Sequence, residues 1–338
     1  MKWLVIGAGS IGTQHLALLK EAGEHEIQVV EPHLERRKAA WEYAGKKQVH
    51  GAVEDAGAFD VGLVCTPTHL HYAHAVWVAE RAPAVIIEKP VAHSAPPDTR
   101  LLDAVQSKVG IVACPYRFHP GFQRLKQIVD QRELGPVFYA QMYYRQRLTE
   151  WRPGTDWRES YSAKRETGGG LFLDRIHEAD AARALFGEPS QLRASYGHYD
   201  NTLDTEVEHV AFCLSLHPGQ NGNVMVTVDL DCITPGYHCG IKLVGPKGMA
   251  SWFYAPLVNG TPDWSGHAQG VRAQLKHWIA CCYGDEEPVQ SVADGYKVLQ
   301  TALASYASAE QGQWVTFAAK PDIAPVVAEA TSTASLAA

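Results

Sequence analysis

Short apolar runs and longer segments of helical periodicity alternate along the first third of the chain. The run at 84–90, for example, is apolar through Ile87 and then ends abruptly in Glu88, Lys89 and Pro90. Strands that alternate with helices favour a parallel, doubly wound α/β sheet. The expected strands are residues 2–6, 27–30, 60–65, 84–90 and 110–114, and the expected helices are 10–20, 70–81 and 95–107.

The pattern changes in the second half of the chain. After a helix at 122–131, apolar and polar residues alternate in several segments that are rich in aromatic residues. Successive strands without intervening helices predict an antiparallel or mixed sheet, so this half is expected to be α+β with a large, mostly antiparallel open sheet. Strands are expected near 137–148, 191–199, 207–216, 223–233, 238–244 and 314–317, with helices near 268–283 and 291–309.

These two patterns divide the chain into two expected domains and a tail. A length of 338 residues suits two domains of ordinary size. We expect a nucleotide-binding domain at 1–118 and a domain for substrate binding and oligomerisation at 119–320. Residues 321–338 are mostly Ala, Ser, Thr and Val, and we expect them to be disordered.

A glycine-rich motif joins the first expected strand to the first expected helix. Gly7, Gly9 and Gly12 form G-x-G-x-x-G in the strand–turn–helix context that a Rossmann dinucleotide site requires. Gly7 permits the tight turn, Gly9 lets the backbone approach a pyrophosphate, and Gly12 lets the helix pack on the strand. Ser10 and Ile11 open the helix, whose free N–H groups attract phosphate. The motif therefore predicts a dinucleotide cofactor.

Glu31 indicates which dinucleotide is bound. It ends the second strand about 20 positions after the motif, where a carboxylate accepts hydrogen bonds from the adenosine ribose. A carboxylate repels a 2′-phosphate, so NAD is the expected cofactor. Arg36 and Arg37 follow closely and could offset this repulsion, which keeps NADP as the alternative.

The ends of two later strands carry further candidates for the cofactor site. In an open parallel sheet, ligands bind at the carboxyl ends of the strands. Cys65-Thr66-Pro67 ends one strand and is expected beside the nicotinamide, together with His71. Glu88 and Lys89 end the next strand and are expected to contact the cofactor, with Lys89 also placed for catalysis. His69, His71 and His74 have no Cys, Asp or Glu at ligand spacing, so no metal site is expected.

A triple glycine at 168–170 opens a further expected helix that contains Asp174, His177 and Asp180. Residues 174 and 177 are three apart and would share one helix face. A carboxylate beside an imidazole can orient it and stabilise its charged form, as a general base requires. His177 is thus a candidate base oriented by Asp174, with Asp180 as the alternative support and an ordinary helix histidine as the plain alternative.

The segment 149–165 is long, irregular and rich in Trp, Arg and Tyr. Arginine binds carboxylate or phosphate through a planar fork, and aromatic faces suit sugar rings. We expect a loop that covers the substrate, and the alternative is an oligomer contact of similar composition. The candidate substrate-binding residues are Trp151, Arg152, Trp157, Arg158 and Tyr161, together with Arg117 between the two domains.

Composition narrows the class of protein. Apolar residues make up 46% of the chain and charged residues 20%, as in ordinary soluble globular proteins. The chain begins directly in a strand and has no run of about 20 apolar residues, so neither a signal peptide nor a membrane span is expected. A net charge of −7 without a basic concentration argues against nucleic acid as the ligand. Seven cysteines without a C-x-x-C pair are expected to be reduced thiols in the cytoplasm.

These motifs together resemble the Gfo/Idh/MocA family, which includes glucose–fructose oxidoreductase and inositol dehydrogenase. The resemblance extends from residue 3 to about 317. Many members separate the Asp and the His by four positions, whereas here they are three apart, which resembles a subgroup with a His-Glu-x-Asp block. The resemblance to the whole family rests on Gly7–Gly12, Cys65-Thr66-Pro67, Glu88-Lys89-Pro90, residues 116–120 and the glycine–Asp–His block.

The resemblance implies an NAD(P)-dependent oxidoreductase that acts on a sugar, amino-sugar, sugar acid, inositol or nucleotide sugar, as a homodimer or homotetramer. Lys89 would hold the substrate oxygen and His177 would accept its proton, or these two roles would be exchanged. Two alternatives remain open: a reductase or a lyase or hydrolase that uses NAD transiently, and a non-catalytic dinucleotide sensor. Arginines at 145, 147, 152, 158 and 165 suggest an anionic substrate.

Overall fold

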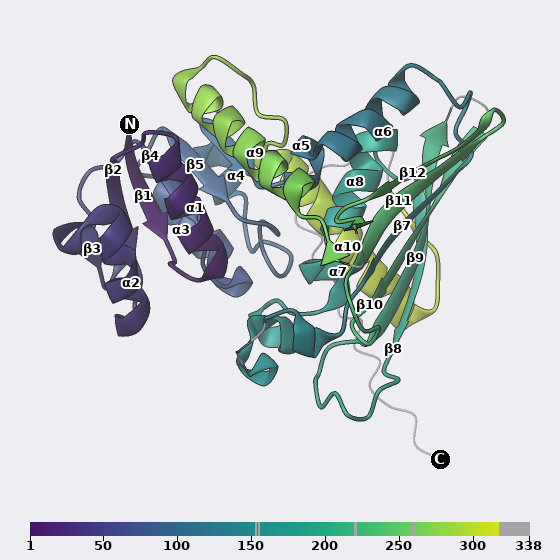
Figure 1. Ribbon diagram of the computed structural model, residues 1–338, viewed down its shortest axis with the longest axis horizontal. Coiled ribbons are helices and arrows are strands. Elements are labelled where there is room, and N and C mark those ends of the chain that lie inside the picture. The colour runs from purple at the N-terminus through teal and green to yellow at the C-terminus, as the bar shows by residue number, and fades with distance from the viewer. Residues whose placement is uncertain (153, 155, 220–221, 259–260, 318–338) are drawn as a thin grey trace.

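The computed structural model describes residues 1–152, 154, 156–219, 222–258 and 261–317 (Figure 1). The tail at 321–338, for which we expected disorder, lies outside the described residues. Two sheets form the frame of the molecule, and they lie side by side with helices between them (Figure 1).

The first sheet is parallel throughout and has the strand order β3-β2-β1-β4-β5-β6. The central strands β1, β4 and β5 are almost fully buried, because helices cover both faces of a parallel sheet. The strands are β1 (Lys2–Ile6), β2 (Glu26–Val30), β3 (Val49–His50), β4 (Val61–Val64), β5 (Ala84–Ile87) and β6 (Val109–Val112).

The helices of this half follow the strands in alternation, as a doubly wound fold requires. They are α1 (Ser10–Glu21), α2 (Leu34–Ala44), α3 (His71–Ala79) and α4 (Arg100–Ala104). Single 3₁₀ turns occupy Lys46–Gln48, Val53–Asp55 and Thr68–Leu70. The prediction of a doubly wound parallel sheet is confirmed.

The second sheet has seven strands in the order β12-β11-β7-β10-β9-β8-β15. Strands β7 and β10 pair in parallel and every other neighbouring pair is antiparallel, which confirms the expected mostly antiparallel sheet. The strands are β7 (Tyr139–Arg145), β8 (Gln191–Gly197), β9 (Val210–Gly219), β10 (Gly222–Asp231), β11 (His238–Gly245), β12 (Gly248–Phe253) and β15 (Val315–Thr316). A small separate hairpin joins β13 (Leu257–Val258) to β14 (Thr261–Pro262).

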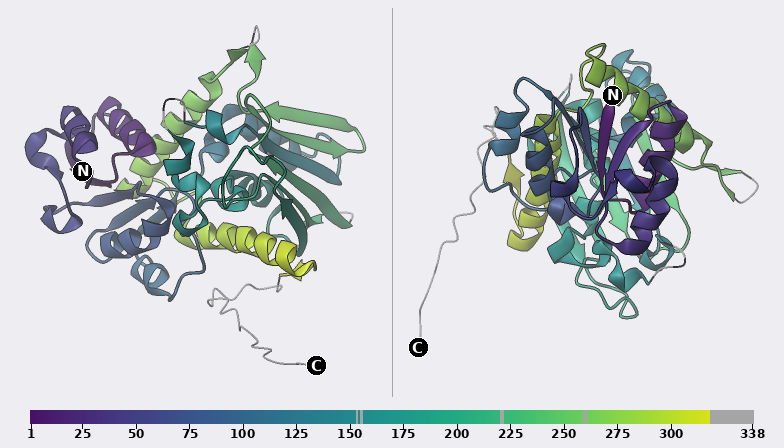
Figure 2. Two further views of the ribbon diagram at one scale, coloured as in Figure 1. Left: turned by 90° about the horizontal axis from the view of Figure 1, so that it is seen from below. Right: turned by 90° about the vertical axis from the view of Figure 1, so that its left-hand side faces the viewer.

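Helices cover one face of this second sheet and leave the opposite face without a helix in the described part of the chain (Figures 1 and 2). Burial alternates along β7 accordingly, with every second residue buried. The helices are α5 (Pro115–Phe118), α6 (Pro120–Asp130), α7 (Leu171–Asp174), α8 (His177–Phe186), α9 (Ser265–Tyr283) and α10 (Val292–Gln311). Four 3₁₀ turns lie at Leu148–Glu150, Trp157–Glu159, Tyr161–Ala163 and Arg165–Thr167.

The two halves interlock through the last two long helices. Helix α9 packs Val271, Leu275 and Trp278 into the core formed by β1, β5 and α1 of the first sheet. Helix α10 contacts both β6 and β8, and therefore both sheets (Figure 2). Residues far beyond position 119 thus complete the core of the nucleotide-binding half.

Two predicted helices and one unpredicted strand illustrate where the structure differs from the expectation. The helix expected at 95–107 is only α4, because Pro96 and Pro97 keep the preceding segment out of helical geometry. Strand β12 was not predicted, since its apolar and polar residues do not alternate cleanly. The single helix expected after residue 170 is in fact two helices, α7 and α8.

Candidate active site

The turn after β1 is built by its glycines. Gly7 has a φ of +97°, and a Cβ there would lie 2.7 Å from the carbonyl oxygen of Cys65. A Cβ on Gly12 would lie 2.0 Å from the carbonyl oxygen of Gly7, so α1 can approach the turn only without a side chain at this position. The turn therefore packs directly against the end of β4.

The beginning of α1 fits the phosphates of a dinucleotide. No side chain caps this helix, whose N-cap is Gly9. A Cβ on Gly9 would meet no protein atom within 4 Å, and Ser10 and Ile11 are exposed beside it. Uncapped N–H groups and the positive end of the helix dipole favour a bound phosphate. These residues are therefore suited to hold the pyrophosphate of NAD.

Glu31 is more enclosed than its expected role at the ribose suggests. It is 3% exposed, and its two carboxylate oxygens accept the N–H groups of Ala8 and His33, each at 2.9 Å. Each oxygen keeps a second lone pair for a further donor. The carboxylate thus links the end of β2 to the glycine turn, in addition to any contact with a ribose.

The turn after β4 contains Cys65, Thr66 and Pro67, and only the last two are accessible to a ligand. His71, expected at the cofactor, is 2% exposed. Its ring nitrogens lie 2.6 Å from the carbonyl oxygen of Pro90 and 2.7 Å from that of Thr66. Both polar atoms of His71 therefore lie against backbone carbonyls, and its contact with the cofactor remains a prediction.

Glu88 is also buried. One carboxylate oxygen lies 2.8 Å from Nε2 of His15, and the other accepts the N–H of Lys89 at 3.3 Å. Burial alone would raise the pKa of Glu88, but the hydrogen bond and charge of His15 and the charge of Lys89 lower it overall. Glu88 therefore remains ionised beside Lys89.

Lys89 reaches from the end of β5 into the second half of the molecule. Its Nζ donates to the carbonyl oxygen of Asp174 at 2.8 Å and lies 3.5 Å from Oδ1 of the same residue. The Tyr161 hydroxyl donates to that Oδ1 at 3.1 Å. Burial would raise the pKa of Asp174, but the charge of Lys89 lowers it overall, so the carboxylate stays ionised.

Asp174 and His177 do not share one helix, contrary to the prediction. Helix α7 ends at Asp174, Arg175 adopts a non-helical backbone with φ −100° and ψ 38°, and α8 begins at His177. The carboxylate of Asp174 engages Lys89 and Tyr161 instead of the imidazole. Asp180, the alternative support, forms a two-pronged ion pair with Arg117.

His177 is held by a different residue, Tyr116. The two rings stack with centroids 4.9 Å apart and planes 20° apart. Burial lowers the pKa of His177 well below its usual value, and the nearby charges of Lys89, Arg175 and His267 lower it further. The imidazole is therefore neutral near pH 7 and free to accept a proton.

A buried polar cluster behind His177 was missed in the sequence. The Arg175 guanidinium donates to the Tyr116 hydroxyl at 2.6 Å and to Oε1 of Glu178 at 3.1 Å, and it lies 3.5 Å above the Tyr144 ring. The Tyr116 hydroxyl also donates to Glu178 at 3.0 Å and lies 3.0 Å from the sulfur of Cys239. The glutamate of the His-Glu-x-Asp block was the one signal in the sequence for this cluster.

The loop residues expected to bind substrate lie at different depths. Arg152 donates to the hydroxyls of Ser160 and Ser162 and lies 4.8 Å from the centre of the Tyr161 ring, which brings it close to Asp174. Trp151 donates to the Gln146 carbonyl oxygen at 2.9 Å and packs edge-on against Tyr144. Trp157 and Arg158 stack on each other nearer the surface, with Arg158 exposed.

Arg117 is engaged by other groups of the protein. Its guanidinium donates to both oxygens of Asp180, at 3.1 and 2.7 Å, and to the carbonyl oxygen of Val289 at 3.1 Å. These bonds join α5 to α8 and to the segment before α10. These contacts give Arg117 a structural role, and its assignment to substrate binding remains a prediction.

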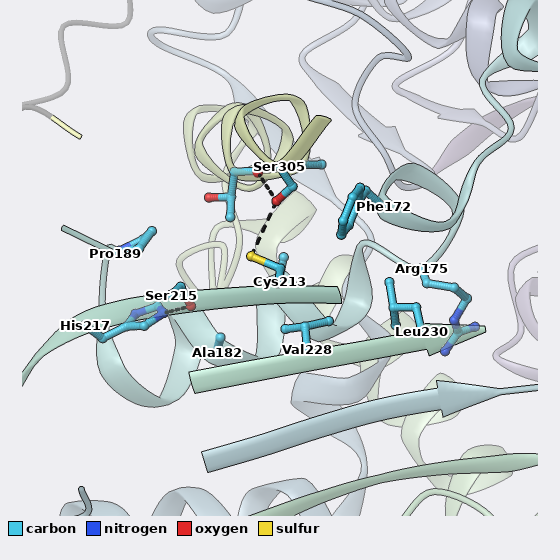
Figure 3. Close-up of a pocket in the computed structure, with 13 residues that line it drawn as sticks. Phe172, Arg175, Ala182, Pro189, Cys213, Ser215, His217, Val228, Leu230 and Ser305 are labelled. Atoms are coloured by element: carbon cyan, nitrogen blue, oxygen red, sulfur yellow. Dashed lines mark hydrogen bonds between the residues drawn. The ribbon is translucent and has the colours of Figure 1, made fainter. Parts of the chain in front are cut away.

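A small cavity of about 20 Å³ lies away from Lys89, between α10, α8 and the second sheet (Figure 3). Phe172, Cys213, Leu230 and Ser305 are among its lining residues, and Arg175 lies at one end. A cavity of this size has room for one water molecule. We therefore regard it as a packing feature of the second half.

Two further observations limit the chemistry. Among the described residues, no group of three or more His, Cys, Asp or Glu side chains is arranged to hold a metal ion. Within the same part of the chain, no helix has the length and apolarity needed to cross a membrane.

Comparisons with known proteins agree with this architecture. The family model described as "Oxidoreductase family, NAD-binding Rossmann fold" matches residues 1–116, and the "GFO/IDH/MocA C-terminal domain" matches residues 122–251. The inositol 2-dehydrogenase of Corynebacterium glutamicum strain ATCC 13032 is 24% identical over 91% of this chain and 94% of its own. The rhizopine catabolism protein MocA of Rhizobium meliloti is 24% identical over 89% of this chain and 92% of its own.

A solved structure shares the whole fold. The WlbA dehydrogenase of Bordetella pertussis, crystallised with NADH and UDP-GlcNAcA, is 22% identical with a TM-score of 0.79, over 95% of this chain and 99% of that one. The fold and the glycine turn define a nicotinamide-dinucleotide oxidoreductase. The chain belongs to the Gfo/Idh/MocA family of NAD-binding oxidoreductases, as the sequence motifs predicted.

Proposed function

We propose that this protein catalyses reversible oxidation of a secondary hydroxyl on a sugar-like substrate, with NAD as the redox partner. The observation that carries the proposal is the ion pair between Lys89 and Asp174 at the carboxyl end of β5. The ammonium group of Lys89 lies at the ligand-binding edge of the sheet. Its positive charge helps to lower the pKa of His177, which keeps that imidazole neutral. A cation beside a neutral base is what removal of a hydroxyl proton requires.

The residues divide the reaction between them as follows. Lys89 binds the substrate hydroxyl oxygen and stabilises the negative charge that develops on it. His177 accepts the hydroxyl proton on an imidazole nitrogen, and Tyr116 keeps the ring in place by stacking. Asp174 orients Lys89 through two contacts and is itself held by Tyr161. NAD, when bound, would accept the hydride from the substrate carbon that carries this hydroxyl.

The cofactor preference belongs to the same proposal. Glu31 presents an enclosed carboxylate at the end of β2, where a 2′-phosphate would meet repulsion. We therefore favour NAD over NADP for this chain.

The surroundings of Lys89 support a substrate that is polar and ring-shaped. Tyr161 and Arg152 lie against Asp174, and the partly exposed Trp151 belongs to the same segment. Aromatic faces suit sugar rings, and arginine forks suit carboxylate or phosphate. Relatives named for inositol and a structure solved with UDP-GlcNAcA fall in this chemical range. We therefore propose inositols, sugar acids and nucleotide sugars as the first substrates to test.

The test is absorbance at 340 nm with NAD and with NADP against inositols, free sugars, sugar phosphates, sugar acids and UDP-sugars. We expect turnover with one class and with NAD, and a loss of at least about 10³-fold in Lys89→Met, as for removal of a group that stabilises the transition state. Lys89→Met should still bind NADH, because the glycine turn is unchanged.

Lys126→Met is the matched control, since Lys126 is exposed and forms an ion pair with Asp130 of the same helix, α6. Full activity of Lys89→Met would contradict the assigned role. NADH binding without net NADH formation from any substrate would favour transient redox chemistry instead.

We also propose that the protein forms a homodimer or homotetramer through the open face of the second sheet. Phe212, Met225, Met249 and Phe253 expose 41–63% of their surface from this sheet. An apolar face of this kind marks an interaction surface. Light scattering should give a dimer or tetramer that Phe212→Asp weakens, while Leu34→Asp on α2 should leave it intact. A monomeric wild type would contradict this proposal.

The compartment we propose is the cytoplasm. All seven cysteines are free thiols and six of them are buried, which suits a reducing environment.

A further inference from the structure

Two buried histidines contact the residues on either side of Lys89 in the chain. His15 on α1 and His71 at the start of α3 are each 2% exposed. They come from different helices and contact the residues immediately before and after Lys89. Both nitrogens of His71 lie against backbone carbonyls, and the buried Nδ1 of His15 has no hydrogen-bond partner among the described residues, so the contacts of these two histidines need a separate explanation.

His15 contacts Glu88, the residue before Lys89. Its Nε2 lies 2.8 Å from Oε1 of Glu88, and its ring packs 5.2 Å from the Trp278 ring of α9. The other oxygen of Glu88 accepts the backbone N–H of Lys89. The carboxylate therefore links an imidazole on the cofactor helix to the backbone of Lys89. Without His15, this carboxylate would be left buried with only one partner.

His71 contacts Pro90, the residue after Lys89. Its Nδ1 lies 2.6 Å from the carbonyl oxygen of Pro90, and its Nε2 lies 2.7 Å from that of Thr66. The ring thus ties the turn after β5 to the turn after β4. A neutral imidazole donates through only one nitrogen, so in that form the two carbonyls compete for one proton.

Lys89 needs such support because its own flexible side chain does little to fix the position of Nζ. A lysine side chain is a flexible stem of four carbons, so the position of its Nζ depends on where the backbone begins. Here Nζ must meet Asp174, which is 85 positions away in the chain. A misplacement of about 1 Å in a catalytic group can cost on the order of 10²-fold in rate.

We propose that His15 and His71 are positioning residues for Lys89: they hold Glu88 and Pro90 so that Nζ stays on Asp174. The importance of this position for turnover rests on the function proposed above, but the position itself can be measured without a substrate.

The test uses variants that keep one donor at a time. Gln places its amide nitrogen near the position of the histidine Nε2, and Asn places it near Nδ1. His15→Gln should therefore keep the bond to Glu88, whereas His15→Leu removes it. His71→Asn should keep the bond to Pro90, and His71→Gln should keep only the bond to Thr66. His217→Gln is the matched control, since His217 is also 2% exposed and bonded through both nitrogens, but in β9.

The direct readout is the NMR signal of Lys89 in protein labelled with ¹³C at the lysine ε-carbons, assigned by its loss in Lys89→Met. We expect the signal to move or broaden in His15→Leu and His71→Gln. It should stay near the wild-type position in His15→Gln, His71→Asn and His217→Gln. An unchanged Lys89 signal in both His15→Leu and His71→Gln would overturn the proposal, and so would equal changes in His71→Asn and His71→Gln.

Turnover separates this inference from the proposed function. With a substrate found at 340 nm, kcat should fall about 10²-fold in His71→Gln while the Kd for NADH changes little, and His71→Asn should recover most of it. A merely structural histidine would lower thermal stability without this recovery. If the Lys89 signal responds as expected but the wild type oxidises no substrate, the positioning stands and the proposed function fails.

Discussion

The glycine turn at Gly7–Gly12 and the helix break at Asp174–His177 both place functional groups, but by different means. Within the turn, neighbouring backbone atoms decide the geometry, because a Cβ on Gly7 or Gly12 would collide with Cys65 or Gly7. At the break, Asp174, Arg175 and His177 contact Lys89, Tyr144 and Tyr116, which are distant in sequence. Short-range sterics can therefore be read from a motif, whereas a break imposed by tertiary contacts cannot.

Substituting the first two glycines separates folding from binding within the turn. Gly7→Ala should lower the free energy of unfolding by about 3 kcal/mol or more, because Gly7 combines positive φ with a 2.7 Å approach to Cys65. Gly9→Ala should change stability by less than about 1 kcal/mol, since its Cβ meets no protein atom. Thermal and urea unfolding measure both effects.

NADH titration completes this comparison. Gly9→Ala should weaken NADH about tenfold or more, or at least about 1.4 kcal/mol, because the new methyl occupies the side that a pyrophosphate must approach. Unchanged NADH affinity in a folded Gly9→Ala protein would contradict our placement of the phosphates. Gly23→Ala provides a control glycine with positive φ and open space, away from the turn.

The break should depend on one buried ion pair. Glu178→Gln leaves Arg175 buried without its charged partner and should lower the free energy of unfolding by about 3 kcal/mol. Tyr116 would then donate to a neutral amide oxygen, a weaker acceptor than a carboxylate, so the stacked His177 should move and kcat should fall.

Glu35→Gln provides the matched comparison. Glu35 forms an exposed pair with Lys38 on α2, and such pairs contribute about 0–1 kcal/mol. Equal stability losses in the two variants would mean that the cluster around Arg175 does not maintain the break.

The same contrast explains how far the sequence could predict this molecule. The parallel sheet, the mostly antiparallel sheet and the family were predicted, because period-two and period-3.6 patterns and the glycine motif are local signals. The capping box at Ser291 and Asp294, which starts α10, is also a local signal, and a helix was expected near 291–309.

Other features depend on long-range packing and could not be predicted in this way. Trp278 of α9 packs into the first sheet, although the amphipathic pattern of α9 alone does not show which of the two sheets this helix covers. Arg117 looks like a ligand-binding arginine until Asp180 is placed beside it by the packing of α5 on α8. The residues that surround Lys89 were assigned from motifs, and their catalytic roles remain predictions for the experiments above.

The smallest effect we predict is a pH dependence that belongs to the break and not to the glycine turn. The pKa of His177 is lowered by burial and by Lys89, Arg175 and His267, so the folded protein binds a proton there less readily than the unfolded chain, whose histidines titrate near pH 6.5. The stability that the neutral imidazole contributes is therefore complete above about pH 6.5 and is lost as the pH falls through the lower folded pKa. Relative to His177→Gln, the wild type should lose at most about 1.4 kcal/mol per pH unit in this window, measured by urea unfolding from pH 8 to pH 5. Parallel stability curves for the two proteins would show that burial and the charges around His177 do not lower its pKa. The acid limb of kcat/KM for the wild type should lie below pH 6.5 for the same reason, because His177 must be neutral to accept the proton.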